Sequence, residues 1–130
     1  MVLVVDDSAM NRKMLCKVMK AAGHTCEEAE DGEVAVRKVR EKIEARGHQY
    51  DGILMDFVMP NMDGPTATKL IRDLGYTAPI FGVTGNTMDS EVDRFLASGA
   101  TMVMGKPFDV DAFVQVMCEN GGRDRRVMSI

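Results

Sequence analysis

The sequence predicts an α/β domain with a doubly wound parallel sheet, and three observations support this. Short apolar runs of strand length alternate five times with longer segments whose apolar residues recur at helical spacing. Four of the five runs are followed by reactive polar residues. No repeat, linker or low-complexity block divides the 130 residues, a length that suits one domain with its own core.

The first two strand–helix units are predicted over residues 2–47. Residues 2–5 are typical of a buried strand, and Ser8 can cap the helix that follows, which Gly23 ends. Residues 25–29 are short and polar, as expected of a strand at a sheet edge, and Asp31 then caps a charged helix that ends near Gly47. The residues expected to face inward are Met14, Leu15, Val18, Met19 and Ala22 in the first helix and Ala35, Val36, Val39 and Ile43 in the second.

Three further units are predicted over residues 52–120. The strands are residues 52–55, 80–83 and 102–104, and the helices begin at Pro65, at Thr87 and at a cap on Asp109. Residues 121–130 lack periodicity, so we expect a domain over 1–120 and a fraying tail. The residues expected to face inward are Ala67, Leu70, Ile71 and Leu74, then Val92, Phe95 and Leu96, then Phe113, Val116 and Met117.

Composition excludes several classes of protein. The net charge of −4 argues against a nucleic-acid surface, because phosphate contacts need clustered Lys and Arg, and the basic residues 123–126 are typical of a solvated tail. No apolar stretch approaches the ~18 residues of a membrane span, and no export signal is recognisable. Three cysteines without metal-ligand spacing indicate reduced thiols in a cytoplasmic protein. The first strand begins almost at Met1, which hints at a domain cut from a longer protein.

Five reactive side chains are expected at one edge of the sheet: Asp6, Asp7, Asp56, Thr84 and Lys106. Each has a simple explanation alone, as a turn or cap acid, a turn hydroxyl or a solvated amine. In an open parallel sheet, however, the carboxyl ends of the strands form the crevice where ligands bind. Their joint delivery by four different strands favours a functional site.

The chemistry of this set indicates a divalent cation and a phosphoryl group. Two carboxylates about 4 Å apart repel by roughly 4 kcal/mol at an effective dielectric near 20, and Mg²⁺, a hard cation that carboxylates bind, relieves this. Three Asp, one Lys and one Mg²⁺ sum to zero charge, which leaves the site ready for an anion. Asp56 can attack phosphorus to form an aspartyl phosphate, while Lys106 and Thr84 stabilise the transferring oxygens.

These residues and their neighbours closely resemble the response regulator receiver domain over nearly the whole chain. The motifs that carry the likeness are Asp6-Asp7, Asp56 with Met59-Pro60 and Asp63-Gly64, Thr84-Gly85, Gly99-Ala100 and Lys106-Pro107-Phe108. The resemblance implies a flavodoxin-like (βα)5 fold with strand order 2-1-3-4-5. Asn11-Arg12 is similar to the receivers of hybrid histidine kinases in particular.

The resemblance also implies a function and a set of residue roles. Asp56 would be phosphorylated by a histidine kinase or a histidine phosphotransfer protein, and the domain would signal rather than turn over a substrate. Mg²⁺ would be held by Asp7, Asp56 and the Val58 carbonyl, with Asp6 assisting through water, while Thr84 and Lys106 sense the phosphate. The signal would pass to an output domain or a downstream protein through the face formed by helix 4, strand 5 and helix 5.

One departure from the family pattern bears on that signal. Many receivers carry Tyr or Phe three residues before the lysine, and that ring swings inward on activation, but this sequence has Val103 there. In the receiver family, the positions that Val58 and Asn86 occupy tune how fast the phosphoryl group is lost.

Three other functions compete with the receiver interpretation. A pseudo-receiver would bind partners without phosphorylation, which the full set of site residues disfavours. A phosphatase of the haloacid dehalogenase type wants a second Asp two residues after the nucleophile, where this chain has Val58. A dinucleotide-binding domain is disfavoured because residues 7–11 offer no glycine-rich turn.

Overall fold

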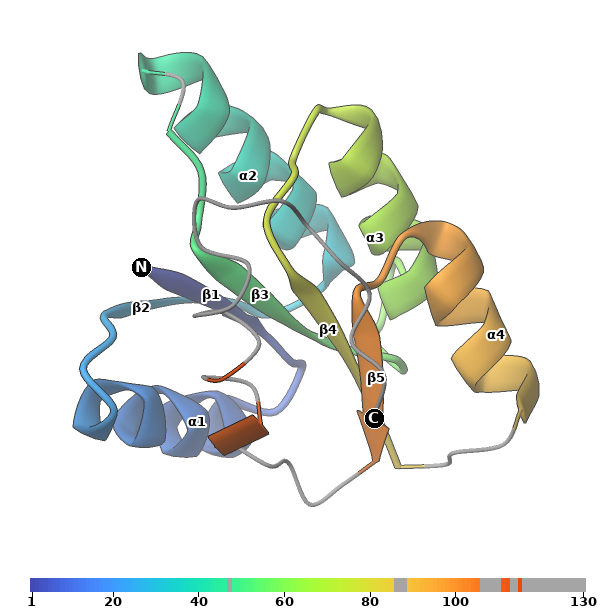
Figure 1. Ribbon diagram of the computed structural model, residues 1–130, viewed down its shortest axis with the longest axis horizontal. Coiled ribbons are helices and arrows are strands. Elements are labelled where there is room, and N and C mark those ends of the chain that lie inside the picture. The colour runs from blue at the N-terminus through green and yellow to red at the C-terminus, as the bar shows by residue number, and fades with distance from the viewer. Residues whose placement is uncertain (47, 86–88, 106–110, 113–114, 116–130) are drawn as a thin grey trace.

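The protein folds as five parallel strands that alternate with helices (Figure 1). The structure, a computed structural model, describes residues 1–46, 48–85, 89–105, 111–112 and 115. The strands form one sheet in the order β2-β1-β3-β4-β5, which confirms the predicted fold and strand order. The elements are β1 (Val2–Val5), α1 (Ala9–Ala21), β2 (Cys26–Ala29), α2 (Gly32–Arg46), β3 (Gly52–Asp56), α3 (Gly64–Asp73), β4 (Ile80–Thr84), α4 (Asp89–Ser98) and β5 (Met102–Gly105).

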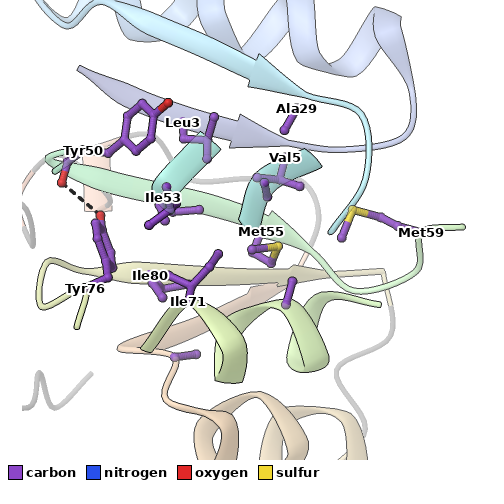
Figure 2. Packing of buried hydrophobic residues seen from close by; sticks show 14 of the residues in the cluster. Leu3, Val5, Ala29, Tyr50, Ile53, Met55, Met59, Ile71, Tyr76 and Ile80 are labelled. Atoms are coloured by element: carbon purple, nitrogen blue, oxygen red, sulfur yellow. Dashed lines mark hydrogen bonds between the residues drawn. The ribbon is translucent and has the colours of Figure 1, made fainter. Parts of the chain in front are cut away.

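Alternate strand residues face opposite sides of the sheet, and both sides are covered. On one side, Val2 and Val4 pack in a cluster with Met19 of α1. On the other side, Leu3 and Val5 belong to a larger cluster that α2, α3 and α4 cover (Figures 1 and 2). All residues of β1, β3 and β4 are buried, so these central strands place the residues that follow them on a rigid base.

The helices bury narrower stripes than the sequence predicted. Six predicted core residues are fully buried: Met19, Ala35, Val39, Ala67, Ile71 and Phe95. Four others are exposed, so those predictions were wrong: Met14, Ala22, Leu70 and Leu96. Leu70 and Leu96 each lie one position from a buried residue, about 100° around the helix, and therefore point away from the sheet. Gly47, Thr87, Asp109, Phe113, Val116, Met117 and residues 121–130 lie outside the described residues.

Polar contacts tie together the loops at the amino end of the sheet. The Tyr76 hydroxyl donates to the Tyr50 carbonyl at 3.0 Å (Figure 2), and the Tyr50 hydroxyl donates to the Glu27 carboxylate. Arg72 of α3 donates to the carbonyl oxygens of Tyr76 and Gly99, each at 2.9 Å. These bonds join the loops that precede β3, β4 and β5 at the edge opposite the predicted site. None of the described helices is long and apolar enough to cross a bilayer.

The Thr68→Val variant is expected to be more stable than the wild type by about 1 kcal/mol, measured by urea denaturation. Thr68 lies fully buried on α3, and its hydroxyl finds no hydrogen-bond partner among the described residues. Valine has nearly the same shape without the polar atom. Thr25→Val in the exposed loop before β2 is the control and should change stability little. A loss of stability in Thr68→Val would mean that the hydroxyl is satisfied.

Candidate functional site

Three carboxylates meet at the carboxyl edge of the sheet, as the sequence predicted. Asp6 and Asp7 directly follow β1, and Asp56 is the last residue of neighbouring β3. One carboxylate oxygen from each of them lies within 4.8 Å of the other two. Asp6 and Asp56 are only 5% and 7% exposed, whereas Asp7 faces solvent. The cluster therefore combines two buried acids with one that is open to solvent.

Local hydrogen bonds fix Asp6 within this cluster. The Ser8 amide donates to Asp6 Oδ1 at 2.8 Å, and Arg12 Nη1 donates to the Asp6 carbonyl at 2.7 Å. Arg12 Nε also pairs with the Glu28 carboxylate at 3.0 Å, which anchors it to edge strand β2. Ser8 itself caps α1, because its hydroxyl accepts from the Asn11 amide at 3.3 Å. The turn from β1 into α1 thus carries both Asp6 and Asp7. The prediction that Ser8 caps α1 is confirmed.

A close backbone approach shapes the loop that carries Asp56. A Cβ on Gly64 would lie 2.1 Å from the Asp56 carbonyl oxygen, so only glycine fits there. The Gly64 amide donates to the Phe57 carbonyl at 2.9 Å, and the Phe57 amide donates to the Val83 carbonyl at 3.0 Å. Asp63 caps α3 through the Thr66 amide at 2.9 Å. The Asp63-Gly64 pair of the sequence motif therefore closes this loop against β3.

Asp31 supports the same loop from α2, a role that sequence reasoning missed. It was predicted as a helix cap, and its Oδ1 does accept from the Val34 amide at 2.9 Å. Its other oxygen accepts from Asn61 Nδ2 at 2.8 Å, and Asn61 holds a left-handed backbone with φ of 67°. The bond from the Val34 amide, opposed by burial and aided by Asn61, lowers the pKa of Asp31 below its ordinary 3.8. Asp31 thereby holds the loop between β3 and α3 in place.

Thr84 ends β4 beside β3 and is 1% exposed. Its hydroxyl donates to Glu91 Oε1 of α4 at 2.6 Å, a contact that the sequence did not predict. Val103, which replaces the family's aromatic residue, is half-buried and packs against the larger core cluster. Phe95 of α4 is fully buried, and a Cβ on Gly82 would lie 2.6 Å from its ring. A large aromatic side chain from α4 therefore packs directly on the backbone of β4.

Of the other predicted site residues, one lies within the described part of the chain and two lie outside it. Val58 lies two residues beyond Asp56, and its side chain is 71% exposed. Lys106 and Asn86 lie outside the described residues, so the approach of the lysine to the acids stays a prediction.

The cluster has the chemistry of a magnesium site. Carboxylate oxygens are hard ligands that suit Mg²⁺, which usually binds through one or two carboxylates and keeps several waters. The three acids offer such oxygens within 4.8 Å of one another, and the exposure of Asp7 lets water complete the coordination of an ion.

Comparison with known families decides what kind of domain this is. Residues 2–117 match the model of the response regulator receiver domain. The chain belongs to this family. A receiver domain is a phosphoacceptor signalling module rather than a catalytic enzyme, so the predicted class of function is confirmed.

Among its relatives, the sensor histidine kinase RcsC of Salmonella typhi is 37% identical over 126 residues, which are 97% of this chain and 13% of the kinase. The two-component response regulator ORR41 of Oryza sativa subsp. japonica is 43% identical over 108 residues, 82% of each protein. The chain thus spans about an eighth of the kinase and most of the response regulator.

Solved receiver structures share this fold. The receiver domain of the histidine kinase CKI1 from Arabidopsis thaliana, complexed with Mg²⁺, has a TM-score of 0.80 and 31% identity over 88% of each chain. The same receiver complexed with Mg²⁺ and BeF₃⁻ has a TM-score of 0.81 and 29% identity, covering 91% of this chain and 89% of that one. A receiver that is similar to this chain therefore binds both Mg²⁺ and BeF₃⁻.

The Asp31→Ala variant is expected to lose about 1–2 kcal/mol of stability near neutral pH, because it removes a helix cap and the acceptor for Asn61. A carboxyl whose pKa is lowered by folding stabilises the protein above its unfolded value of 3.8, and this is lost as the pH falls through the lower folded value. The difference between wild type and variant should therefore shrink below about pH 4, measured by urea denaturation at several pH values.

Asp31→Asn is the matched control, because it keeps a capping oxygen and removes only the charge. It should cost less stability than alanine. A cost of Asp31→Ala that stays constant down to about pH 2 would contradict the role given to the charge.

Proposed function

We propose that this receiver accepts a phosphoryl group on Asp56 from a phosphohistidine and thereby switches its binding to a partner. The observation that carries the proposal is the cluster of three carboxylates around the end of β3. Asp56 ends a fully buried strand, so the backbone that carries its carboxylate is held at the carboxyl edge of the sheet. An ionised carboxylate so placed is a competent nucleophile toward phosphorus.

In this proposal Mg²⁺ is held by Asp7, Asp56 and the Val58 carbonyl, with Asp6 assisting through water. The grouping of the three acids within 4.8 Å and the metal bound by the CKI1 receiver support it. When bound, the ion would offset the charge of the acids and of the incoming phosphoryl group. The hydrogen bond from Ser8 to Asp6 keeps one oxygen of that carboxylate turned toward the β1–α1 turn.

The transfer step balances without any further reactant. A carboxylate oxygen of Asp56 donates an electron pair to phosphorus as the bond from phosphorus to the imidazole nitrogen of the donor breaks. The electron pair of that bond returns to the donor nitrogen. Because the other ring nitrogen carries a proton, the donor leaves as neutral imidazole, and the product is an aspartyl phosphate. Thr84 and Lys106 are proposed to contact the phosphoryl oxygens, the hydroxyl as a donor and the ammonium as a countercharge.

The partners follow from the class of domain. Receivers accept phosphoryl groups from histidine kinases, and the donor here is proposed to be such a kinase or a histidine phosphotransfer protein. The match to RcsC supports a receiver that forms one part of a hybrid kinase. We propose that this receiver works in the cytoplasm. The output is proposed to leave through the face of α4, β5 and the following helix, toward an output domain or a downstream protein.

With Mg²⁺ and radiolabelled acetyl phosphate, the wild type is expected to acquire acid-stable, base-labile label and Asp56→Asn to acquire none. The amide cannot act as the nucleophile, although it has nearly the same shape. Asp73→Asn removes one exposed carboxylate at the end of α3 and should label like the wild type. Chelation of Mg²⁺ should abolish labelling in every variant.

Label on Asp56→Asn at another residue would overturn the assignment of Asp56. A wild type that neither labels nor binds Mg²⁺ at millimolar levels would support a pseudo-receiver instead.

A further inference from the structure

The Thr84 hydroxyl is already engaged by a charged acceptor. It donates to Glu91 Oε1 at 2.6 Å, a short distance typical of a hydrogen bond to a carboxylate. Thr84 is buried at the end of β4, and Glu91 is half-buried in the first turn of α4. Hydrogen bonds to charged groups are worth more than neutral ones, particularly when water is kept away.

This bond competes with the role proposed for Thr84. A threonine hydroxyl has a single hydrogen, so it cannot donate to Glu91 and to a phosphoryl oxygen at once. The carboxylate of Glu91 and a phosphoryl group on Asp56 are also both anions, so they cannot share the hydroxyl without repulsion. Thr84 must therefore leave Glu91 before it can contact a phosphorylated Asp56.

We propose that Glu91 is a positioning residue that holds Thr84 in its resting orientation and so sets how readily the site accepts a phosphoryl group. The inference rests on the proposed function of Asp56 and adds a residue that opposes it. The free energy needed to break the bond between Glu91 and Thr84 makes the contact of Thr84 with a phosphoryl group on Asp56 less favourable by the same amount.

The location of Glu91 also indicates which part of α4 responds when Thr84 is released. Other contacts anchor the rest of α4 to the Asp56 loop without involving Thr84. Arg94 Nη2 pairs with the Asp63 carboxylate at 3.1 Å, and its guanidinium lies 5.5 Å from the centre of the Phe57 ring. Phe57 and Phe95 meet edge to face, with ring centres 5.3 Å apart. The second turn of α4 is thus attached to the loop through Arg94 and Phe95, whereas Glu91 attaches the first turn to Thr84.

This arrangement fits the absence of an aromatic side chain at Val103. In this chain the movement of Thr84 changes a direct contact with the first turn of α4, so no ring on β5 is needed to transmit it. A partner that binds α4 would then respond to phosphorylation, because the bond between Glu91 and Thr84 is lost.

The test is the affinity for BeF₃⁻, a mimic of the phosphoryl group, at saturating Mg²⁺. It is measured by calorimetry for two variants of Glu91. Glu91→Ala should bind BeF₃⁻ about tenfold more tightly than the wild type, which corresponds to loss of one charge-assisted hydrogen bond. Glu91→Gln keeps a neutral acceptor and should gain about threefold. The affinity for Mg²⁺ alone should stay unchanged in both.

A double-mutant cycle separates the hydrogen bond from simple charge repulsion. In the Thr84→Ala background, Glu91→Ala should change BeF₃⁻ affinity by less than about twofold, because there is no hydroxyl left to release. In the Thr84→Ser background the gain should return. Asp93→Asn, which removes a negative charge from the exposed side of α4, should have no comparable effect.

An unchanged affinity in Glu91→Ala, or an equal gain with and without the Thr84 hydroxyl, would overturn the role of Glu91. These results are distinct from failure of the proposed function, in which the wild type itself would not bind BeF₃⁻.

Discussion

The crowding of three carboxylates at one edge of the sheet is the constraint on which the rest of the site depends. Asp6, Asp7 and Asp56 offer oxygens within 4.8 Å of one another. At such separations each pair of charges repels by a few kcal/mol at an effective dielectric near 20. The fold sustains this because β1 and β3 are buried and hydrogen-bonded side by side, so the acids cannot move apart. Because a bound cation relieves this repulsion, the same crowding favours cation binding at the site.

Contacts around this cluster link the site to the helices. Gly64 brings the start of α3 against the Asp56 carbonyl, and Asp31 holds the intervening loop through Asn61. On the other side, Thr84 joins the site to Glu91 of α4. A phosphoryl group on Asp56 would therefore act on Thr84 and, through Glu91, on α4, while the sheet itself is held by its buried core.

The sequence predicted the features that depend on local pattern and on topology. Short apolar runs located the strands, and a parallel sheet was enough to predict that Asp6, Asp7 and Asp56 lie together. The exposure of Leu70 and Leu96 was missed, because periodicity does not show how wide a stripe the sheet covers. Side-chain bonds between distant residues left no periodic signal, so the sequence did not reveal them: Arg72 with Gly99, Asp31 with Asn61, and Thr84 with Glu91.

The most direct test of the central claim compares the free energy of unfolding of the wild type and Asp7→Asn, with EDTA and with excess Mg²⁺. Asp7 is exposed, so the change removes a charge and leaves the packing intact. With EDTA the variant should be more stable than the wild type, because repulsion is relieved. With Mg²⁺ at a hundredfold excess over Kd, the wild type should gain about 2.7 kcal/mol and the variant less. A variant no more stable with EDTA, together with a wild type indifferent to Mg²⁺, would contradict the account.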